Sequence, residues 1–390
     1  MTAPLTVPVG EVATRFHTLA GAFTTAGGDR LAEVTLAFEV YGELNARRDN
    51  AILVFHALTG SQHAAGFNPA VPGVGSRWTD EMQVGWWDGF IGPRKALDTN
   101  RFAVICVNYL GGCYGSTGPA SIDPDTGRPY GSSFPRLSLA DVVDTQVRLL
   151  DELGIGRLHA AIGGSVGGLM CLSLATRHPD RVRNVIPIAS GLRVTALQRI
   201  HMFEQSLAIE ADGRFEGGDY EPGAGPERGM ALARIVAHKS FVSLRAMEER
   251  ARLEVVDRDE AGGYVQIVSP LESYMWHQGT KFVRRFDANA YLRIIEMWQT
   301  FDLAAQAGES DLGDVLRRCR DQRFMVFSID SDVCYYPEEQ EELVRELARA
   351  EVPARRVTVH SDKGHDAFLL EPHLFAPHLA DTLEHEWGRW

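Results

Sequence analysis

The sequence has few cysteines, and their positions give no sign of a covalent or metal-bound framework. Five cysteines occur among 390 residues, at positions 106, 113, 171, 319 and 334. An odd number without close pairs argues against both a disulfide scaffold and a structural zinc site. Cys106 and Cys171 lie in apolar runs, where a small apolar side chain suits a core position. We therefore expect a reduced, cytoplasmic protein that binds no metal.

Long apolar stretches and an excess of positive charge are missing as well. No window approaches the run of about 18 apolar residues that a membrane-spanning helix needs, and the N-terminus has no pattern of a signal peptide. With 39 basic and 52 acidic side chains, the net charge of −13 argues against nonspecific binding to nucleic acid or to an anionic membrane. The chain also lacks a dinucleotide fingerprint and a P-loop, so we expect no bound cofactor.

Short apolar runs alternate with helical patterns along most of the chain. The predicted strands cover residues 33–41, 52–58, 102–110, 159–165, 182–190, 323–329 and 355–360. The predicted helices between and after them cover residues 137–153, 167–178, 337–350 and 373–387. This alternation predicts an α/β fold with a mostly parallel sheet and helices on both of its faces.

One long interval, residues 191–318, breaks the alternation. It contains no convincing buried strand, but it has helical patterns over 196–209, 229–238, 244–254 and 289–299. Because ligands of open α/β sheets bind at the carboxyl edge, a helical insertion between two core strands predicts a lid over that edge. We therefore divide the chain into a core domain, residues 1–190 and 319–390, and an inserted lid, residues 191–318.

The segment Gly163-x-Ser165-x-Gly167 lies between a predicted strand and a predicted helix. This is the pattern of a nucleophile elbow, in which a tight turn presents the serine hydroxyl at the carboxyl edge of the sheet. Glycines two residues to either side avoid a steric clash, and the following helix directs its positive end toward the serine. The alternative interpretation is an ordinary glycine-rich turn.

A nucleophilic serine needs a base, and the base needs an acid that orients it. In folds with a nucleophile elbow, the acid and then the histidine follow the serine along the chain. His365 comes after the predicted strand 355–360, whereas His360 belongs to that strand. Asp330 and Asp332 both follow the strand 323–329, and the order alone leaves both possible.

Two backbone N–H groups are needed to stabilise the oxyanion of an acyl-transfer reaction. Val166, the residue after the serine, is expected to supply one of them. The second is expected from the loop after the strand that ends near His56, and there we choose Leu58.

Several distinctive blocks are spread over nearly the whole length of the sequence. They are residues 41–45 (YGELN), 50–60, 108–119 (NYLGGCYGSTGP), 126–131 (TGRPYG), 134–135, the elbow, 285–292 (RFDANAYL) and 364–369 (GHDAFL). Together these blocks resemble the homoserine O-acetyltransferases of the α/β-hydrolase superfamily. The resemblance implies a ping-pong reaction in methionine biosynthesis. Ser165 would take the acetyl group from the co-substrate acetyl-CoA and pass it to L-homoserine, with His365 as base and Asp332, rather than Asp330, as the acid.

The resemblance also implies how the substrate is held and how the chain assembles. Arg234 would bind the carboxylate of homoserine and Asp366 its ammonium group, and the lid helices would form a homodimer. Without the resemblance, Arg234 would be taken as a solvated arginine on a helix. Three alternatives stay open: a homoserine O-succinyltransferase or a serine O-acyltransferase of the same fold, an esterase-type serine hydrolase, and a binding protein without catalysis.

Overall fold

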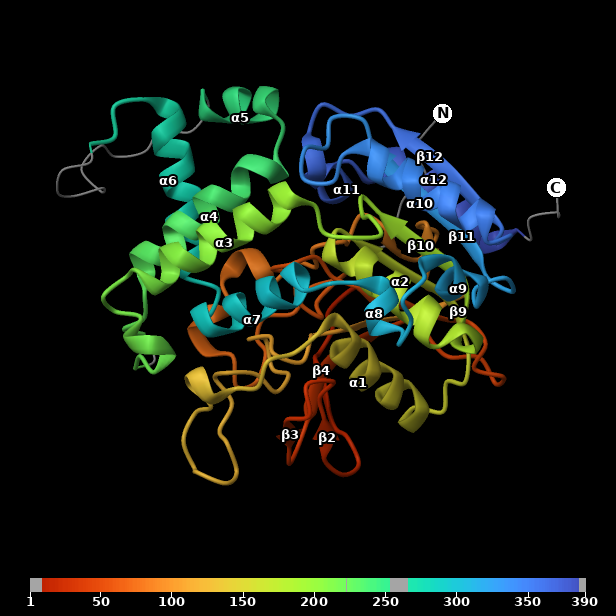
Figure 1. Cartoon of the computed structure of the whole chain (residues 1–390), viewed down its shortest axis with the longest axis horizontal. Helices are drawn as coiled ribbons and strands as arrows, with labels where there is room; N and C mark the ends of the chain where they lie inside the picture. The colour runs from red at the N-terminus through yellow and green to blue at the C-terminus, as the bar shows by residue number, and fades with distance from the viewer. Residues whose placement is uncertain (1–8, 222, 253–265, 386–390) are drawn as a thin grey trace.

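The computed structural model describes residues 9–221, 223–252 and 266–385, and a single eight-stranded sheet forms their centre (Figure 1). In spatial order the strands are β1 (Arg15–Thr18), β4 (Thr35–Tyr41), β8 (Ala103–Val107), β5 (Ala51–Phe55), β9 (Leu158–Gly164), β10 (Val182–Ile188), β11 (Arg323–Ile329) and β12 (Ala354–Val359). From β8 to β12 all neighbours are parallel, and β1 and β4 are antiparallel additions at one edge. The expected mostly parallel sheet is confirmed.

The order of the strands reverses between β5 and β9. The chain leaves β5 toward β8 on one side and then crosses to β9 on the other side of β5. Such a switch point opens a crevice beyond the carboxyl ends of the two strands. Two further pairs of short strands lie outside this sheet, β2 (Phe23–Thr24) with β3 (Arg30–Leu31) and β6 (Ile91–Gly92) with β7 (Leu97–Asp98).

Both faces of the sheet are covered, as the apolar strands require. All residues of β5 and β8 are buried. The helices α1 (Leu139–Glu152) and α2 (Val166–Arg177) contribute to one hydrophobic cluster, and α12 (Pro372–Glu384) contributes to the other. The remaining core helices are α10 (Pro337–Arg349) and the short α11 (Ala367–Leu370).

The described elements between β10 and β11 are all helical. They are α3 (Ala196–Glu210), α4 (Glu227–Phe241), α5 (Leu244–Ala251), α6 (Pro270–Val283), α7 (Ala288–Gln299), α8 (Leu303–Gln306) and α9 (Leu312–Arg317). Figure 1 shows α3, α4, α5 and α6 gathered on one side of the molecule, and contacts join α4 to both α3 and α6. By contrast, α8 contacts α2 and α9 contacts α10 in the core. The division into a core and a lid of residues 191–318 stays a prediction.

Most predicted elements are present, but some of their ends differ. The predicted strand 52–58 ends at Phe55, and the strand 102–110 ends at Val107, because the chain turns at the carboxyl edge. Helix α6 was not predicted, and the predicted ends of the helices 244–254 and 373–387 lie outside the described residues. None of the helices in the described part of the chain combines the length and apolar character that crossing a membrane requires.

Candidate active site

Ser165 stands in a sharp turn between β9 and α2. Its backbone angles, φ 59° and ψ −125°, lie where side chains other than glycine are rare. A Cβ atom at Gly163 would lie 2.4 Å from the backbone of Gly167, and a Cβ atom at Gly167 would lie 2.4 Å from the carbonyl oxygen of Phe55. Only glycine therefore fits at both positions, and the turn is as tight as the sequence pattern predicts.

Neighbouring groups hold this strained turn in place. The Ser165 N–H donates to the carbonyl oxygen of Ile188 at 2.9 Å, and the hydroxyl of Ser190 donates to the carbonyl oxygen of Ser165 at 2.5 Å. The side chain of Ser165 accepts no capping bond from α2. It remains available at the positive end of that helix, where developing negative charge is stabilised.

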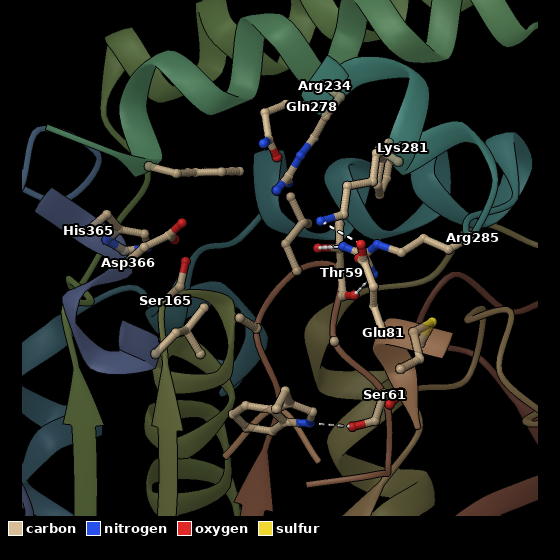
Figure 2. Close-up of a pocket in the computed structure, with 18 of the residues that line it drawn as sticks. Thr59, Ser61, Glu81, Ser165, Arg234, Gln278, Lys281, Arg285, His365 and Asp366 are labelled. Carbon is tan, nitrogen blue, oxygen red and sulfur yellow. Dashed lines mark hydrogen bonds and ion pairs between the residues drawn. The ribbon is translucent and has the colours of Figure 1, made fainter. Parts of the chain in front are cut away.

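His365 and Asp332 form a buried pair. Nδ1 of His365 donates to Oδ2 of Asp332 at 2.7 Å, while Oδ1 of Asp332 accepts from the backbone N–H groups of Cys334 at 2.8 Å and Tyr335 at 2.9 Å. With its proton on Nδ1, the neutral ring carries a lone pair on Nε2. Nε2 is buried and has no hydrogen-bond partner among the described residues. Ser165 and His365 line the same cavity (Figure 2).

The pKa of His365 is raised above its ordinary value. Burial lowers this pKa, but the Asp332 carboxylate raises it by its charge and by its hydrogen bond, with smaller contributions from Asp366 and Glu339. The imidazolium form is therefore stabilised at the position where a general base receives its proton.

The rival acid, Asp330, lies elsewhere. Its Oδ2 is 2.8 Å from Nδ1 of His360, whose side chain is 83% exposed, and its Oδ1 accepts from the N–H of Ser361 at 3.0 Å. The structure thus joins Asp332, and not Asp330, to His365.

Two unpaired backbone N–H groups occur where the oxyanion hole was predicted. Residues 57–60 form a turn that the Gly60 N–H closes by donating to the carbonyl oxygen of Ala57 at 2.9 Å. Leu58 lies at a corner of this turn and lines the cavity, and Val166 begins α2. Within the described part of the chain, neither the Leu58 N–H nor the Val166 N–H donates to a protein acceptor.

His56 precedes this turn, and its surroundings do not suit a general base. Its ring stacks on Tyr109 at a centroid distance of 3.6 Å, and its Nδ1 lies 2.8 Å from the carbonyl oxygen of Ala57. Burial lowers the pKa of His56 to about 4, so the ring is neutral near pH 7. The Tyr109 hydroxyl donates to the His56 carbonyl oxygen, which fixes the loop further.

A cavity of about 310 Å³ lies above the serine, and its two walls differ (Figure 2). The core wall includes Ser165, His365, Asp366 and the turn that contains Leu58. The opposite wall comes from α4, α6 and the segment after α6. Its members are Arg234, Phe241, Gln278, Lys281, Phe282 and Arg285.

Arg234 reaches into this cavity from α4. Its guanidinium carbon lies 5.4 Å from the ring centre of Phe241 and 5.2 Å from that of Phe282. Burial and the nearby charge of Arg285 lower its pKa, and it has no hydrogen bond or ion pair to any described residue. Figure 2 shows Arg234 pointing down into the cavity and Asp366 pointing into it from beside His365. Arg234 and Asp366 therefore bring a positive and a negative charge to the cavity.

Three polar residues on the wall opposite Ser165 were not predicted as site residues. Gln278 and Lys281 belong to α6, the helix that the sequence pattern did not reveal, and Lys281 Nζ lies 2.7 Å from Oε1 of Glu81 across the cavity. Arg285 begins the block 285–292 used for the resemblance, but its contacts could not be inferred from that pattern. No group of three or more His, Cys, Asp or Glu side chains in residues 9–221, 223–252 and 266–385 could hold a metal ion.

Comparison with known proteins places this geometry among related enzymes. A family model described as alpha/beta hydrolase fold matches residues 50–372, which confirms the predicted fold. A homoserine O-acetyltransferase from Rhodospirillum rubrum is 43% identical, over 92% of this chain and 88% of that protein. A homoserine O-succinyltransferase from Magnetococcus marinus is 40% identical, over 98% and 97%. The crystal structure of esterase E22 has a TM-score of 0.85 and 26% identity, over 96% of this chain and 100% of that one.

Proposed function

Because the chain belongs to the homoserine O-acetyltransferase family and has the α/β-hydrolase fold, we propose that it transfers an acetyl group from acetyl-CoA to the hydroxyl of L-homoserine. One observation carries this proposal. The cavity that contains Ser165 and the unpaired Nε2 of His365 also contains Arg234 and Asp366. Their charges match the carboxylate and the ammonium group of an amino acid.

In the first half-reaction, Oγ of Ser165 attacks the thioester carbonyl and its proton moves to Nε2 of His365. The N–H groups of Leu58 and Val166 stabilise the oxyanion of the tetrahedral intermediate. When the intermediate collapses, the C–S bond breaks, and the thiolate leaves with the proton from His365. The acetyl group is then an ester on Ser165.

In the second half-reaction, the homoserine hydroxyl attacks this ester and gives its proton to His365. Collapse breaks the bond to Oγ of Ser165, which takes the proton back. Arg234 holds the carboxylate of homoserine and Asp366 its ammonium group, so the hydroxyl is directed at the ester. We place this reaction in methionine biosynthesis and the enzyme in the cytoplasm. We expect the enzyme to need no bound cofactor.

A matrix of two donors and two acceptors tests the proposal. Acetyl-CoA and succinyl-CoA are each combined with L-homoserine and L-serine, and thiol release is followed. We expect acetyl-CoA with homoserine to turn over fastest. Faster turnover with succinyl-CoA would assign the activity of the Magnetococcus marinus relative instead. Hydrolysis of acetyl-CoA at one rate with and without homoserine would make the protein an esterase.

We also propose a homodimer formed through the lid helices. Four apolar side chains of α3 are exposed along one stripe: Leu197, Ile200, Phe203 and Leu207. Leu232 of α4, a helix packed on α3, is 50% exposed as well. Large exposed apolar side chains gathered on two packed helices are typical of an interface.

Light scattering tests the dimer. We expect a dimer for the unchanged chain and a monomer for Phe203→Glu, because a carboxylate would be buried without a partner. The matched control is Ile122→Glu, which changes an apolar side chain with 59% exposure outside the lid and should leave the dimer intact. A monomeric unchanged chain would contradict the proposal.

A further inference from the structure

Arg285 connects the lid side of the cavity to the core. It lies between the end of α6 and the start of α7, and its side chain crosses to the loop after β5. Its Nη1 donates to the carbonyl oxygen of Thr59 at 2.9 Å, and its Nη2 donates to Oγ1 of Thr59 at 3.3 Å (Figure 2). Both terminal nitrogens of the guanidinium group therefore bind the same residue, Thr59.

Arg285 is itself anchored by its neighbours. The hydroxyl of the fully buried Tyr114 donates to the backbone carbonyl oxygen of Arg285 at 2.7 Å and lies 3.4 Å from its Nη1. The guanidinium carbon also lies 5.3 Å from the ring centre of Phe282, within range of a cation–π contact. A side chain fixed at its backbone and along its length can hold another group in position.

The residue that Arg285 holds belongs to the turn that bears the predicted oxyanion donor. Thr59 follows Leu58, and the peptide between Thr59 and Gly60 carries the N–H that closes the turn on Ala57. Its carbonyl oxygen is the acceptor for Arg285. That peptide is thus held on both sides, while the Leu58 N–H beside it stays unpaired. Small displacements of such a donor reduce transition-state stabilisation strongly.

The two arginines of the cavity differ in their partners. Both contact Phe282, but the side chain of Arg234 makes no hydrogen bond to a described residue, whereas that of Arg285 donates to Thr59 and Tyr114. We propose that Arg285 is a positioning residue that holds the turn of residues 57–60, so that the Leu58 N–H faces the reacting carbonyl. This inference rests on the proposed acyl-enzyme function.

Acylation by p-nitrophenyl acetate tests this role apart from homoserine and CoA binding. The release of p-nitrophenolate reports the formation of the acyl-enzyme. We expect Arg285→Met to slow it by roughly 10- to 100-fold, short of the loss seen when an oxyanion donor is removed entirely. Arg285→Lys, which can still donate to the Thr59 carbonyl oxygen, should recover part of the rate. The KM for homoserine should change little in both variants.

The matched control is Arg284→Met, because Arg284 is the exposed neighbour and its side chain has no hydrogen bond or ion pair to any described residue. It should acylate at the unchanged rate. Acylation of Arg285→Met within about twofold of the unchanged protein, or a loss that appears only in the KM for homoserine, would overturn the positioning role. If Arg285→Met does not fold, Arg285→Ala takes its place, and acylation by that variant within about twofold of the unchanged rate decides against the role. Failure of the unchanged protein to acylate would instead reject the proposed function.

Discussion

The two walls of the cavity are built in different ways. On the core side, Ser165 and His365 line the cavity, and Asp332 is bonded to His365. Each of the three follows a strand of the sheet, and they are 4%, 2% and 2% exposed in this order. The Ser165 N–H and the Asp332 carboxylate take part in hydrogen bonds, whereas Nε2 of His365 has no partner among the described residues. On the opposite wall, which we call the lid wall, the guanidinium of Arg234 lies over the rings of Phe241 and Phe282. The sheet thus fixes the predicted catalytic groups, and the segment between β10 and β11 supplies Arg234, the predicted ligand for the substrate carboxylate.

The two walls meet beside His365, the predicted base. Gly364 precedes His365 and has a φ of 76°, and a Cβ atom there would lie 2.5 Å from the backbone nitrogen of Ser243. The Ser243 N–H donates to the carbonyl oxygen of Lys363 at 3.3 Å, between α4 and α5. A side chain at position 364 would separate the walls, so the lid backbone is part of what positions the His365 loop.

Removal of the Ser165 hydroxyl should cause the largest loss of activity. We expect Ser165→Ala to lower acetyl transfer by roughly 10³-fold or more, because no acyl-enzyme can form. Mass spectrometry of peptides after reaction with acetyl-CoA alone should find the acetyl group on Ser165 in the unchanged protein. Transfer by Ser165→Ala at an unchanged rate, or an acetyl group on another side chain, would reject this assignment.

Asp332→Asn should be the next most damaging change, with a loss of about 10²-fold or more, because the carboxylate no longer fixes the proton on Nδ1 of His365. The pH dependence sharpens the test. Since neutral His365 is the base, kcat/KM of the unchanged protein should rise with pH through a pKa above the ordinary value of 6.5. In Asp332→Asn the main raising cause is gone and burial remains, so this limb should move to lower pH. A limb that stays in place would show that another group titrates.

The core wall could be predicted from sequence because its determinants are local. Gly163 and Gly167 mark the turn around Ser165, and His365 follows the last strand in the expected order. Asp332 was preferred over Asp330 only through the resemblance, since both follow β11 and the hydrogen-bond geometry that separates them arises in the folded chain. Strand ends were less predictable, because apolar residues continue beyond the last paired residue.

The lid wall could be predicted only in part. Helix α6 has Ser273, Tyr274, Gly279 and Phe282 as its buried residues, a mixture that gives no apolar stripe at helical spacing. The bond from Arg285 to Thr59 joins residues 226 positions apart, and no local pattern encodes it. Sequence patterns identify residues whose role depends on their own turn, but they do not identify partners brought together by folding.

Arg234→Met should weaken the binding of homoserine at the lid wall and leave the acylation of Ser165 at the core wall unchanged. We expect the KM for homoserine to rise by roughly 10-fold or more, since a charge-assisted bond to a carboxylate is lost. Acylation of Ser165 by p-nitrophenyl acetate should stay close to the unchanged rate. Lys239→Met, at an exposed position of the same helix, is the control. If the rates of both half-reactions fell together, Arg234 would instead have a role in the acylation of Ser165.

The smallest effect is expected from loss of an exposed ion pair that joins the two walls of the cavity. Lys281 of α6 and Glu81 of the core form an ion pair of 2.7 Å, with side chains 38% and 56% exposed. Water screens such a pair, so its contribution is about 0–1 kcal/mol. Lys281→Gln should therefore change kcat/KM less than about fivefold at low salt, and the difference should vanish as salt is added. A loss that persists at high salt would mean that Lys281 contacts a substrate, and the lid wall would then carry a second cation for ligand binding.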